Sequence, residues 1–215
     1  MDAALHDWQW TDFWPYAILM IVIVSWPLYR FLAPRSWREW AGAGLVQAFI
    51  IALFAEMYGF PLTIYALTSF LHLKIPLVHS SGHLWASLLG YGAFGAMVEM
   101  TIGFMFVVTG VVLIARGWME VYRSDGHLVT GGVYGIIRHP QYAGIFLAIF
   151  GQLVHWPTTP TLVLAPAIVW AYVRLARREE AHLFGRFGGQ YLEYRRQVPM
   201  FIPRWRGALQ ADKAL

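Results

Sequence analysis

The sequence predicts an all-α integral membrane protein with about five transmembrane helices. Hydrophobic residues make up 58% of the 215 residues and charged residues only 13%, whereas soluble domains carry about a quarter charged residues. The mean hydropathy of +0.50 indicates lipid as the main solvent. The chain has no cysteine, which excludes disulfides, thiolate nucleophiles and Cys-ligated metal centres.

Five apolar stretches account for the predicted helices. A helix needs roughly 20 mostly apolar residues to cross the hydrocarbon core of a bilayer. The stretches are approximately Phe13–Leu32, Gly42–Tyr58, Leu88–Ile114, Tyr142–His155 and Thr161–Leu175. The first stretch follows aspartates rather than basic residues, unlike a signal peptide, so we expect it to be retained. The last two form a C-terminal helical hairpin whose short limbs leave four spans as an alternative.

The basic residues predict the orientation of these helices. With five spans, all 16 Lys and Arg residues except Lys74 fall on the same side of the membrane. Because cytoplasmic loops carry an excess of Lys and Arg, we expect the N-terminus outside and the C-terminus in the cytoplasm. The chain is therefore expected to be a multi-pass protein with its ionisable chemistry on the cytoplasmic face.

Residues 126–144 interrupt the apolar pattern between the third and fourth spans. Their glycines, among them Gly132, let the backbone turn and approach a ligand closely. Pro140 permits a helix to begin just after Arg138 and His139. The arginine, the histidine and exposed backbone N–H groups would then lie at a helix N-terminus, which suits a carboxylate or a phosphate.

Residues 174–196 predict an extension of the fifth span followed by an amphipathic helix on the cytoplasmic surface. Aromatic residues recur there at three- and four-residue spacing, opposite the arginines; they are Phe184, Phe187, Tyr191 and Tyr194. Val198–Pro203 is expected to be extended, because each proline restricts the residue before it. Taken alone, the arginines indicate only orientation and anionic-lipid contact, and the adjacent Glu179 and Glu180 indicate only salt bridges.

Taken together and in order, these elements resemble the isoprenylcysteine carboxyl methyltransferase and phospholipid methyltransferase superfamily over roughly residues 103–205. The matching elements are Gly132–Tyr134, Arg138–Gly144, Glu179–Leu183, Phe187–Tyr194 and Val198–Pro203. The resemblance implies a methyltransferase core with a cytoplasmic cofactor site at residues 88–206. N-terminal transmembrane helices of unassigned role would occupy residues 1–87, and residues 207–215 would form a tail.

Members of that family bind S-adenosylmethionine and methylate a lipophilic or membrane-associated acceptor that enters from the bilayer. The implied cofactor contacts are Gly126, His127, Leu128, Val129, Tyr134, His139, Pro140, Gln141, Tyr142 and Glu179. The expected catalytic residues are Arg138, Arg174, Arg178 and Glu180, of which Arg174 or Arg178 would hold an anionic acceptor. We expect contact with membrane lipids and no metal, nucleic acid or obligate protein partner.

The acceptor stays open among phospholipid amines, lipophilic carboxylates and hydrophobic thiols. Leu175 stands where the eukaryotic isoprenylcysteine enzymes carry an arginine, which weakens the case for a prenylcysteine carboxylate. Two other functions also remain open. One is an NADPH-dependent membrane reductase of the sterol or steroid type, which has a similar Arg-His-Pro pattern. The other is a lipid-binding membrane protein that has lost catalysis.

Several ionisable residues lie outside this pattern. Glu56 and Glu99 fall inside predicted spans, where an ionisable group is a functional candidate, although we favour protonation or a hydrogen bond across the bundle. Three histidines predict an interfacial loop rather than a metal site, because their spacing is irregular; they are His72, His79 and His83. Glu120 is interpreted as balancing the charge of nearby arginines.

Overall fold

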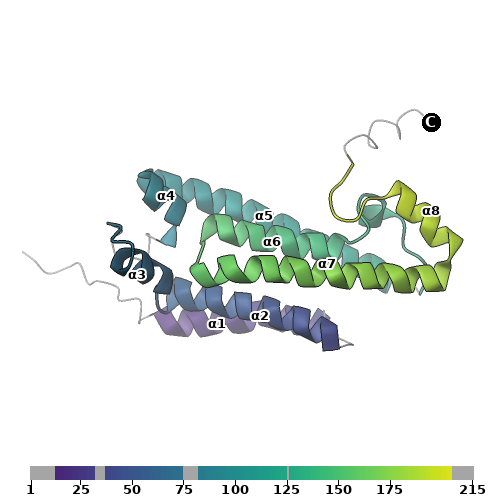
Figure 1. Ribbon diagram of the computed structural model, residues 1–215, viewed down its shortest axis with the longest axis horizontal. Helices are drawn as coiled ribbons and strands as arrows, with labels where there is room; N and C mark the ends of the chain where they lie inside the picture. The colour runs from purple at the N-terminus through teal and green to yellow at the C-terminus, as the bar shows by residue number, and fades with distance from the viewer. Residues whose placement is uncertain (1–12, 32–36, 75–81, 125, 205–215) are drawn as a thin grey trace, which may run out of the picture. The chain divides into compact units, whose positions relative to one another are not determined.

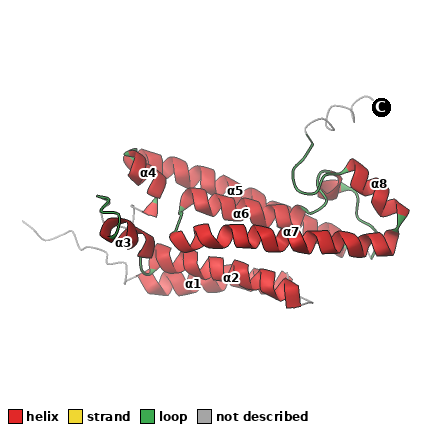
Figure 2. Cartoon of the chain, in the orientation of Figure 1, coloured by secondary structure: helices red, strands yellow, loops and turns green. Residues whose placement is uncertain are grey.

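The computed structural model describes residues 13–31, 37–74, 82–124 and 126–204 (Figure 1). Within these ranges the regular structure is helical and no strand is present (Figure 2). The elements are α1 (Trp14–Phe31), α2 (Trp37–Tyr58), α3 (Leu62–Ser69), α4 (Leu84–Leu89), α5 (Gly92–Tyr122), the short 3-10 helix η3 (Gly132–Gly135), α6 (Pro140–His155), α7 (Thr159–Phe187) and α8 (Gly189–Gln197). The all-α prediction is confirmed.

Among the residues that the structure describes, three helices are long and apolar enough to cross a membrane: α2 over Glu39–Tyr58, α5 and α7. A shorter apolar helix lies within α1, and α6 has 16 residues. Apolar side chains along α5 are exposed, among them Phe94 at 71% and Phe104 at 65%. Exposed apolar surface of this kind is stable in hydrocarbon rather than in water, and the helices satisfy their own backbone hydrogen bonds there.

α5 runs further than the sequence predicts and continues past Ile114 to Tyr122. α7 continues past Leu175 to Phe187, as expected from the predicted extension of the fifth span, and a further helix, α8, follows it. At Gly188, φ is +53°, a left-handed conformation that favours glycine and turns the chain into α8. The aromatic residues expected on one helix are instead divided between the end of α7 and α8.

The chain packs as two compact units. The first unit is drawn from Met1–Phe104 and Gly151–Ala171, and the second from Met105–Phe150 and Tyr172–Leu215. α5, α6 and α7 each contribute residues to both units. The sequence-based division into N-terminal helices up to residue 87 and a core from residue 88 is a different kind of division, along the chain. It stays a prediction.

In the first unit, α1 and α2 lie side by side (Figure 1), and two buried carboxylates each cap a short helix. One oxygen of Glu56 accepts the Thr63 N–H at 2.9 Å, in the first turn of α3. Glu99 accepts the N–H of Ala86 in the first turn of α4. The first turn of a helix leaves N–H groups without partners, so both carboxylates have a structural role in holding α3 and α4.

Two of the three clustered histidines lie within the described residues, and His79 lies outside them. Nδ1 of His83 is 3.2 Å from the carbonyl oxygen of His155 and 3.7 Å from a Glu99 oxygen. His72 is an exposed residue near the end of α3, with φ of +52°. Among the residues that the structure describes, no three His, Cys, Asp or Glu side chains gather as metal ligands.

In the second unit, glycines bring α5 and α6 close together. A Cβ at Gly144 of α6 would lie 2.5 Å from the Gly110 carbonyl oxygen of α5, and one at Gly117 would lie 2.9 Å from the Gln141 side chain. Small residues allow helix backbones to approach in this way within membranes. The contact fixes the N-terminal end of α6, where the Arg-His-Pro sequence lies, against α5.

Candidate functional site

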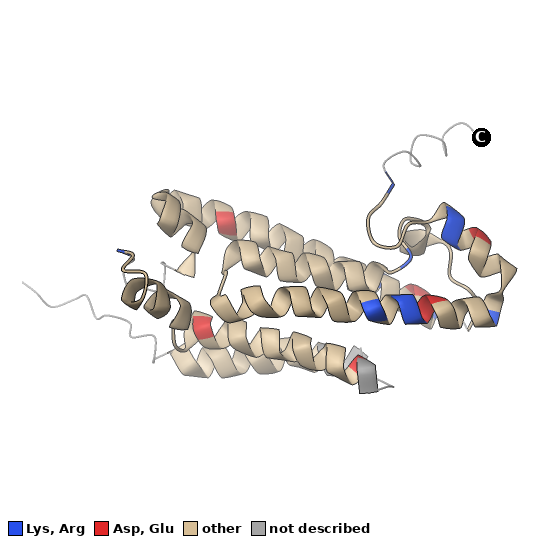
Figure 3. Cartoon of the chain, in the orientation of Figure 1, with Lys and Arg blue, Asp and Glu red and all other residues tan. Residues whose placement is uncertain are grey.

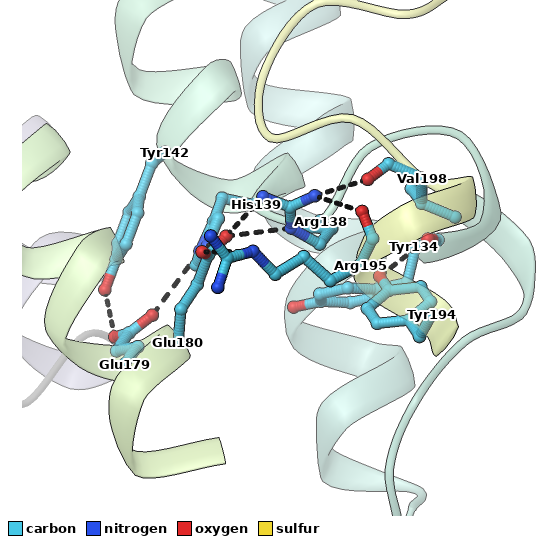
Figure 4. A network of polar contacts seen from close by, with 9 residues as sticks. All are labelled: Tyr134, Arg138, His139, Tyr142, Glu179, Glu180, Tyr194, Arg195 and Val198. Carbon is cyan, nitrogen blue, oxygen red and sulfur yellow. Dashed lines mark hydrogen bonds and ion pairs between the residues drawn. The ribbon is translucent and has the colours of Figure 1, made fainter. Parts of the chain in front are cut away.

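The two segments singled out in the sequence come together in the second unit. Figure 4 shows nine of their residues, drawn from η3, the residues around the start of α6, the C-terminal half of α7, and α8 with the residue that follows it. As predicted, α6 begins at Pro140, which needs no N–H partner in the first helical turn. The glycine-rich segment and the adjacent glutamates of α7 thus form one cluster.

The backbone N–H groups of the two residues just before α6 are paired within the chain, and ligand binding at the start of the helix stays a prediction. The Arg138 N–H donates to the Pro199 carbonyl at 2.9 Å, and the His139 N–H donates to the Met200 carbonyl at 3.2 Å. The predicted extended segment after α8 supplies both carbonyls, since an extended chain presents its carbonyls to a neighbouring backbone. No local sequence pattern indicates this pairing, which joins positions about 60 residues apart.

Arg138 connects α7, α8 and the C-terminal segment. Its Nε and Nη2 donate to one oxygen of Glu180, at 2.8 and 2.7 Å. Its Nη1 donates to the carbonyls of Arg195, at 3.0 Å, and Val198. Both charged side chains are buried, with 10% of Arg138 and 9% of Glu180 exposed. These contacts make Arg138 and Glu180 an internal brace, and the catalytic role expected for them stays a prediction.

His139 lies between the two glutamates of α7. Its Nδ1 is 3.5 Å from an oxygen of Glu179, and its Nε2 is 3.4 Å from an oxygen of Glu180. The ring stacks on Tyr142, with centroids 5.6 Å apart and planes within 5°. Burial alone would lower the pKa of His139, but hydrogen bonds and charge from Glu179 and Glu180 outweigh it and hold the pKa above its usual value. The two carboxylates therefore favour the protonated form of His139, in which each ring nitrogen can donate to one of them.

Glu179 is the accessible member of the glutamate pair. Its side chain is 43% exposed, against 9% for Glu180. One of its oxygens accepts the Tyr142 hydroxyl, and the other faces His139 (Figure 4). Tyr142 in turn packs edge-on against Tyr172, with centroids 5.1 Å apart. The neighbours fix the direction of the Glu179 carboxylate while one side of it remains open.

Tyr134 and α8 form the other wall of the cluster. The Tyr194 hydroxyl donates to the Tyr134 carbonyl at 2.8 Å. Burial first, and then nearby negative charge, raises the pKa of both phenols far above the usual value, so both stay protonated. Tyr191 and Tyr194 pack with Val198 against Leu128. The buried face of α8 thus covers the loop that carries four of the expected cofactor contacts.

The remaining expected residues lie in the same unit. Gly126 has φ of +84°, and its carbonyl accepts Nη2 of Arg186 at 2.9 Å. His127 is exposed, whereas Leu128 and Val129 are half-buried. The side chains of Arg174 and Arg178 are exposed on α7. Figure 3 shows further basic and acidic residues along this part of α7 and on α8.

Sequence reasoning missed two residues of the cluster. The Phe201 ring lies over His139, with centroids 5.7 Å apart, and also packs against Phe146. Glu120, at the end of α5, accepts the Val133 N–H of η3 at 3.2 Å instead of balancing an arginine. The neighbouring pair Gly131 and Gly132 was a usable signal, because a backbone without side chains can receive such a carboxylate.

Comparison with known proteins connects this cluster to a family. A family model described as phospholipid methyltransferase matches residues 91–190, which include the cluster residues from η3, α6 and α7. The chain is 30% identical over 128 residues to protein-S-isoprenylcysteine O-methyltransferase B of Arabidopsis thaliana, covering 56% of this chain and 61% of that protein. It is 39% identical over 87 residues to the protein-S-isoprenylcysteine O-methyltransferase of Homo sapiens, covering 40% and 31%.

A further relative carries a different kind of name. The chain is 32% identical over 117 residues to a cobalt-zinc-cadmium resistance protein of Cupriavidus metallidurans, covering 53% of each protein. The chain thus spans 31% to 61% of the length of these three relatives. The family model and the named relatives indicate kinship with methyltransferases, and the apolar helices indicate a membrane protein. This chain is a multi-pass integral membrane protein whose residues 91–190 belong to the phospholipid methyltransferase family, and its named relatives include isoprenylcysteine O-methyltransferases.

Proposed function

We propose that this protein transfers a methyl group from S-adenosylmethionine to a lipophilic acceptor at the membrane. The observation that carries the proposal is the His139, Tyr142 and Glu179 cluster, which lies in the part of the chain that matches the family model. Glu179, whose carboxylate is accessible, lies on α7, which is long and apolar enough to cross a membrane. His139 directly precedes the apolar helix α6.

The chemistry of these side chains fits such a cofactor. A sulfonium cofactor of this class carries an ammonium, a carboxylate, two ribose hydroxyls and an adenine ring. Glu179 offers a half-exposed carboxylate that can accept from an ammonium or a hydroxyl. The His139 cation suits a carboxylate, and the ring of Tyr142 provides a flat surface for adenine. A buried carboxylate oxygen of Glu120 lacks a donor among the described residues, so the site has unused acceptor capacity.

The proposed mechanism depends on positioning. The bound cofactor supplies a methyl group on a positively charged sulfur, and an in-line displacement needs correct geometry and the exclusion of water. Glu179 and His139 would orient the donor, and Phe201 with the buried tyrosines of α8 would keep water out. The Arg138 brace would hold these elements in place, and Arg174 or Arg178 would hold an anionic acceptor.

The site chemistry favours an acceptor that is already nucleophilic. Both ring nitrogens of His139 face carboxylates, and in its protonated form the ring would have no lone pair with which to accept a proton. The phenols of Tyr134 and Tyr194 are held protonated. A carboxylate or a thiolate needs no base, whereas an ammonium must first lose a proton. We therefore propose a carboxylate, a thiolate or an amine that reaches the site neutral, leaving its identity to experiment.

We also propose five spans, formed by α1, α2, α5, α6 and α7, with the N-terminus outside and the cofactor site in the cytoplasm. The distribution of Lys and Arg supports this orientation, because all of them except Lys74 then lie on the cytoplasmic side. A water-soluble cofactor would meet the cluster from the cytoplasm, while a lipophilic acceptor would arrive within the bilayer.

Ligand binding to the purified full-length protein tests the cofactor. S-adenosylhomocysteine, S-adenosylmethionine and NADPH would be compared by thermal unfolding in detergent or nanodiscs. A ligand at 100 times its dissociation constant adds about 2.7 kcal/mol of stability, so both adenosyl ligands should raise the unfolding temperature. A shift with NADPH alone would support the reductase instead. No shift with either adenosyl ligand would overturn the proposal.

A further inference from the structure

The carboxylate of Glu120 is held under η3 and has one oxygen in use. Oε1 accepts the Val133 N–H at 3.2 Å. Gly132 makes this approach feasible: its φ is +54°, and a Cβ there would lie 2.6 Å from the carboxylate carbon of Glu120. Both the left-handed conformation and the missing side chain are therefore needed to bring the carboxylate against the backbone.

The second oxygen of Glu120, Oε2, is buried, and no hydrogen bond reaches it from the described part of the chain. The described residues also include no basic side chain in an ion pair with Glu120. A buried carboxylate oxygen without a donor is costly, and native proteins rarely leave one so. The position calls for a donor that the described residues do not supply.

The surroundings of Glu120 are those of the expected cofactor site. Val133, whose N–H it accepts, precedes Tyr134 in η3, and the Tyr134 phenol hydrogen-bonds to the Gln141 side chain. Tyr134 and Gln141 are both expected cofactor contacts. The charge of Glu120 also reaches the phenols of Tyr134 and Tyr194, since it contributes to raising the pKa of each.

We propose that Glu120 is a further cofactor-binding residue, whose Oε2 accepts a hydrogen bond from the ammonium or a ribose hydroxyl of the adenosyl ligand. The inference rests on the proposed function. It separates the two oxygens of one side chain: Oε1 positions η3 and Oε2 contacts the ligand. It also gives the site a second carboxylate, from α5, in addition to Glu179 on α7.

Glu120→Gln separates these two roles. The glutamine keeps a side-chain oxygen for the Val133 N–H but removes the charge. The matched control is Glu193→Gln, which removes one negative charge from an exposed residue of α8 in the same unit, where it pairs with Arg196 and Gln197. Calorimetric titration of the purified proteins with S-adenosylhomocysteine should show affinity about tenfold or more weaker for Glu120→Gln, because bonds to charged groups are the strong ones. Glu193→Gln should bind as the wild type does.

A second ligand identifies the donor. Methylthioadenosine has the adenine and the ribose but lacks the amino-acid end. If Glu120 accepts from the ammonium, the substitution weakens only S-adenosylhomocysteine; if it accepts from the ribose, it weakens both ligands by the same factor. Either result supports the proposal. Unchanged affinity for both ligands would overturn it and leave Oε2 in contact with a bound water only.

Folding and the parent proposal are tested separately. The unfolding temperature without ligand shows whether Glu120→Gln is intact. If it is not, Glu120→Asp decides, because it keeps the charge and withdraws the carboxylate by one methylene; wild-type affinity in that variant would overturn the proposal. If the wild-type protein binds no adenosyl ligand, the proposed function fails and the role of Glu120 fails with it. Wild-type binding with an unaffected Glu120→Gln refutes the role of Glu120 alone.

Discussion

At the scale of single residues, adjacent side chains in the cluster have different roles. Glu179 and Glu180 are neighbours in sequence, yet Glu180 is buried on Arg138 and Glu179 is open on one side. His139 contacts both and joins the brace to the accessible carboxylate. On α7, Glu180 therefore supports the structure, whereas its neighbour Glu179 is the proposed ligand contact.

Arg138→Gln should destabilise the protein strongly. The substitution removes both bonds to Glu180 and leaves a buried carboxylate without its cation, which costs about 3–5 kcal/mol when a buried pair is broken. Arg196→Gln is the control, because its pair with Glu193 is exposed and such pairs contribute about 0–1 kcal/mol. Denaturation of the two variants in the same detergent measures the difference. Equal stability would show that Arg138 is not a brace.

His139 should make stability depend on pH. Its pKa is raised in the folded state, so its contribution is full below the unfolded pKa of about 6.5 and is lost as pH rises through the folded pKa. Unfolding temperatures of the wild type and His139→Gln, measured from about pH 6 to about pH 9, give the test. The advantage of the wild type should shrink as pH rises. An advantage that stayed constant or grew would contradict the assigned imidazolium.

At the scale of secondary structure, glycines determine how the helices approach and turn. Gly110 and Gly144 permit the close contact between α5 and α6, and Gly188 separates α7 from α8. Glu56 and Glu99 act at this scale too, because each holds a short helix by its first turn. Two features of these elements were predictable from the sequence. Pro140 indicated where α6 begins, and the resemblance in motif order implied that the Arg-His-Pro segment meets the α7 glutamates.

Other features of these elements were not predictable from local pattern. The N–H groups of Arg138 and His139 pair with carbonyls after α8, and η3 receives a carboxylate from α5. Such contacts join positions far apart in the chain, whereas periodicity and propensity describe neighbours. The end of α7 is an exception, because the Gly188-Gly189 pair in the sequence indicated a helix end there. The regular spacing of the aromatic residues across this pair favoured one continuous helix instead.

Gly144→Ala should destabilise the contact between α5 and α6. The added Cβ would meet the Gly110 carbonyl at 2.5 Å, and crowding of a packed interface costs about 1–3 kcal/mol. Gly185→Ala is the control in α7, because no atom lies within 4 Å of its Cβ position and alanine stabilises a helix by about 0.5–1 kcal/mol over glycine. Thermal unfolding should move in opposite directions for the two. A neutral Gly144→Ala would mean that the backbones are further apart.

At the scale of the whole molecule, composition and charge distribution lead to the same result as family membership. The apolar helices make the chain a multi-pass membrane protein, and with five spans all of its Lys and Arg residues except Lys74 would fall on one side of the membrane. The second unit holds the described residues of the candidate site.

The orientation can be tested because the chain has no cysteine. Ser69→Cys in α3 and Gln197→Cys in α8 each introduce one exposed thiol. In intact cells, a membrane-impermeant maleimide should label Ser69→Cys only, and Gln197→Cys should react only after permeabilisation, because the proposed topology places the basic side in the cytoplasm. Labelling of Gln197→Cys in intact cells would reverse the proposed topology.

Methyl transfer itself is the most direct test of the account. Membranes from cells that produce the wild-type protein would be incubated with S-adenosylmethionine carrying a labelled methyl group, and the lipid extract would be analysed by mass spectrometry. Glu179→Gln, with Glu193→Gln as the exposed control, would be treated identically. The account predicts a labelled lipophilic product from the wild type and from Glu193→Gln, and none above background from Glu179→Gln. Equal product from Glu179→Gln, or no labelled product from the wild type, would contradict it.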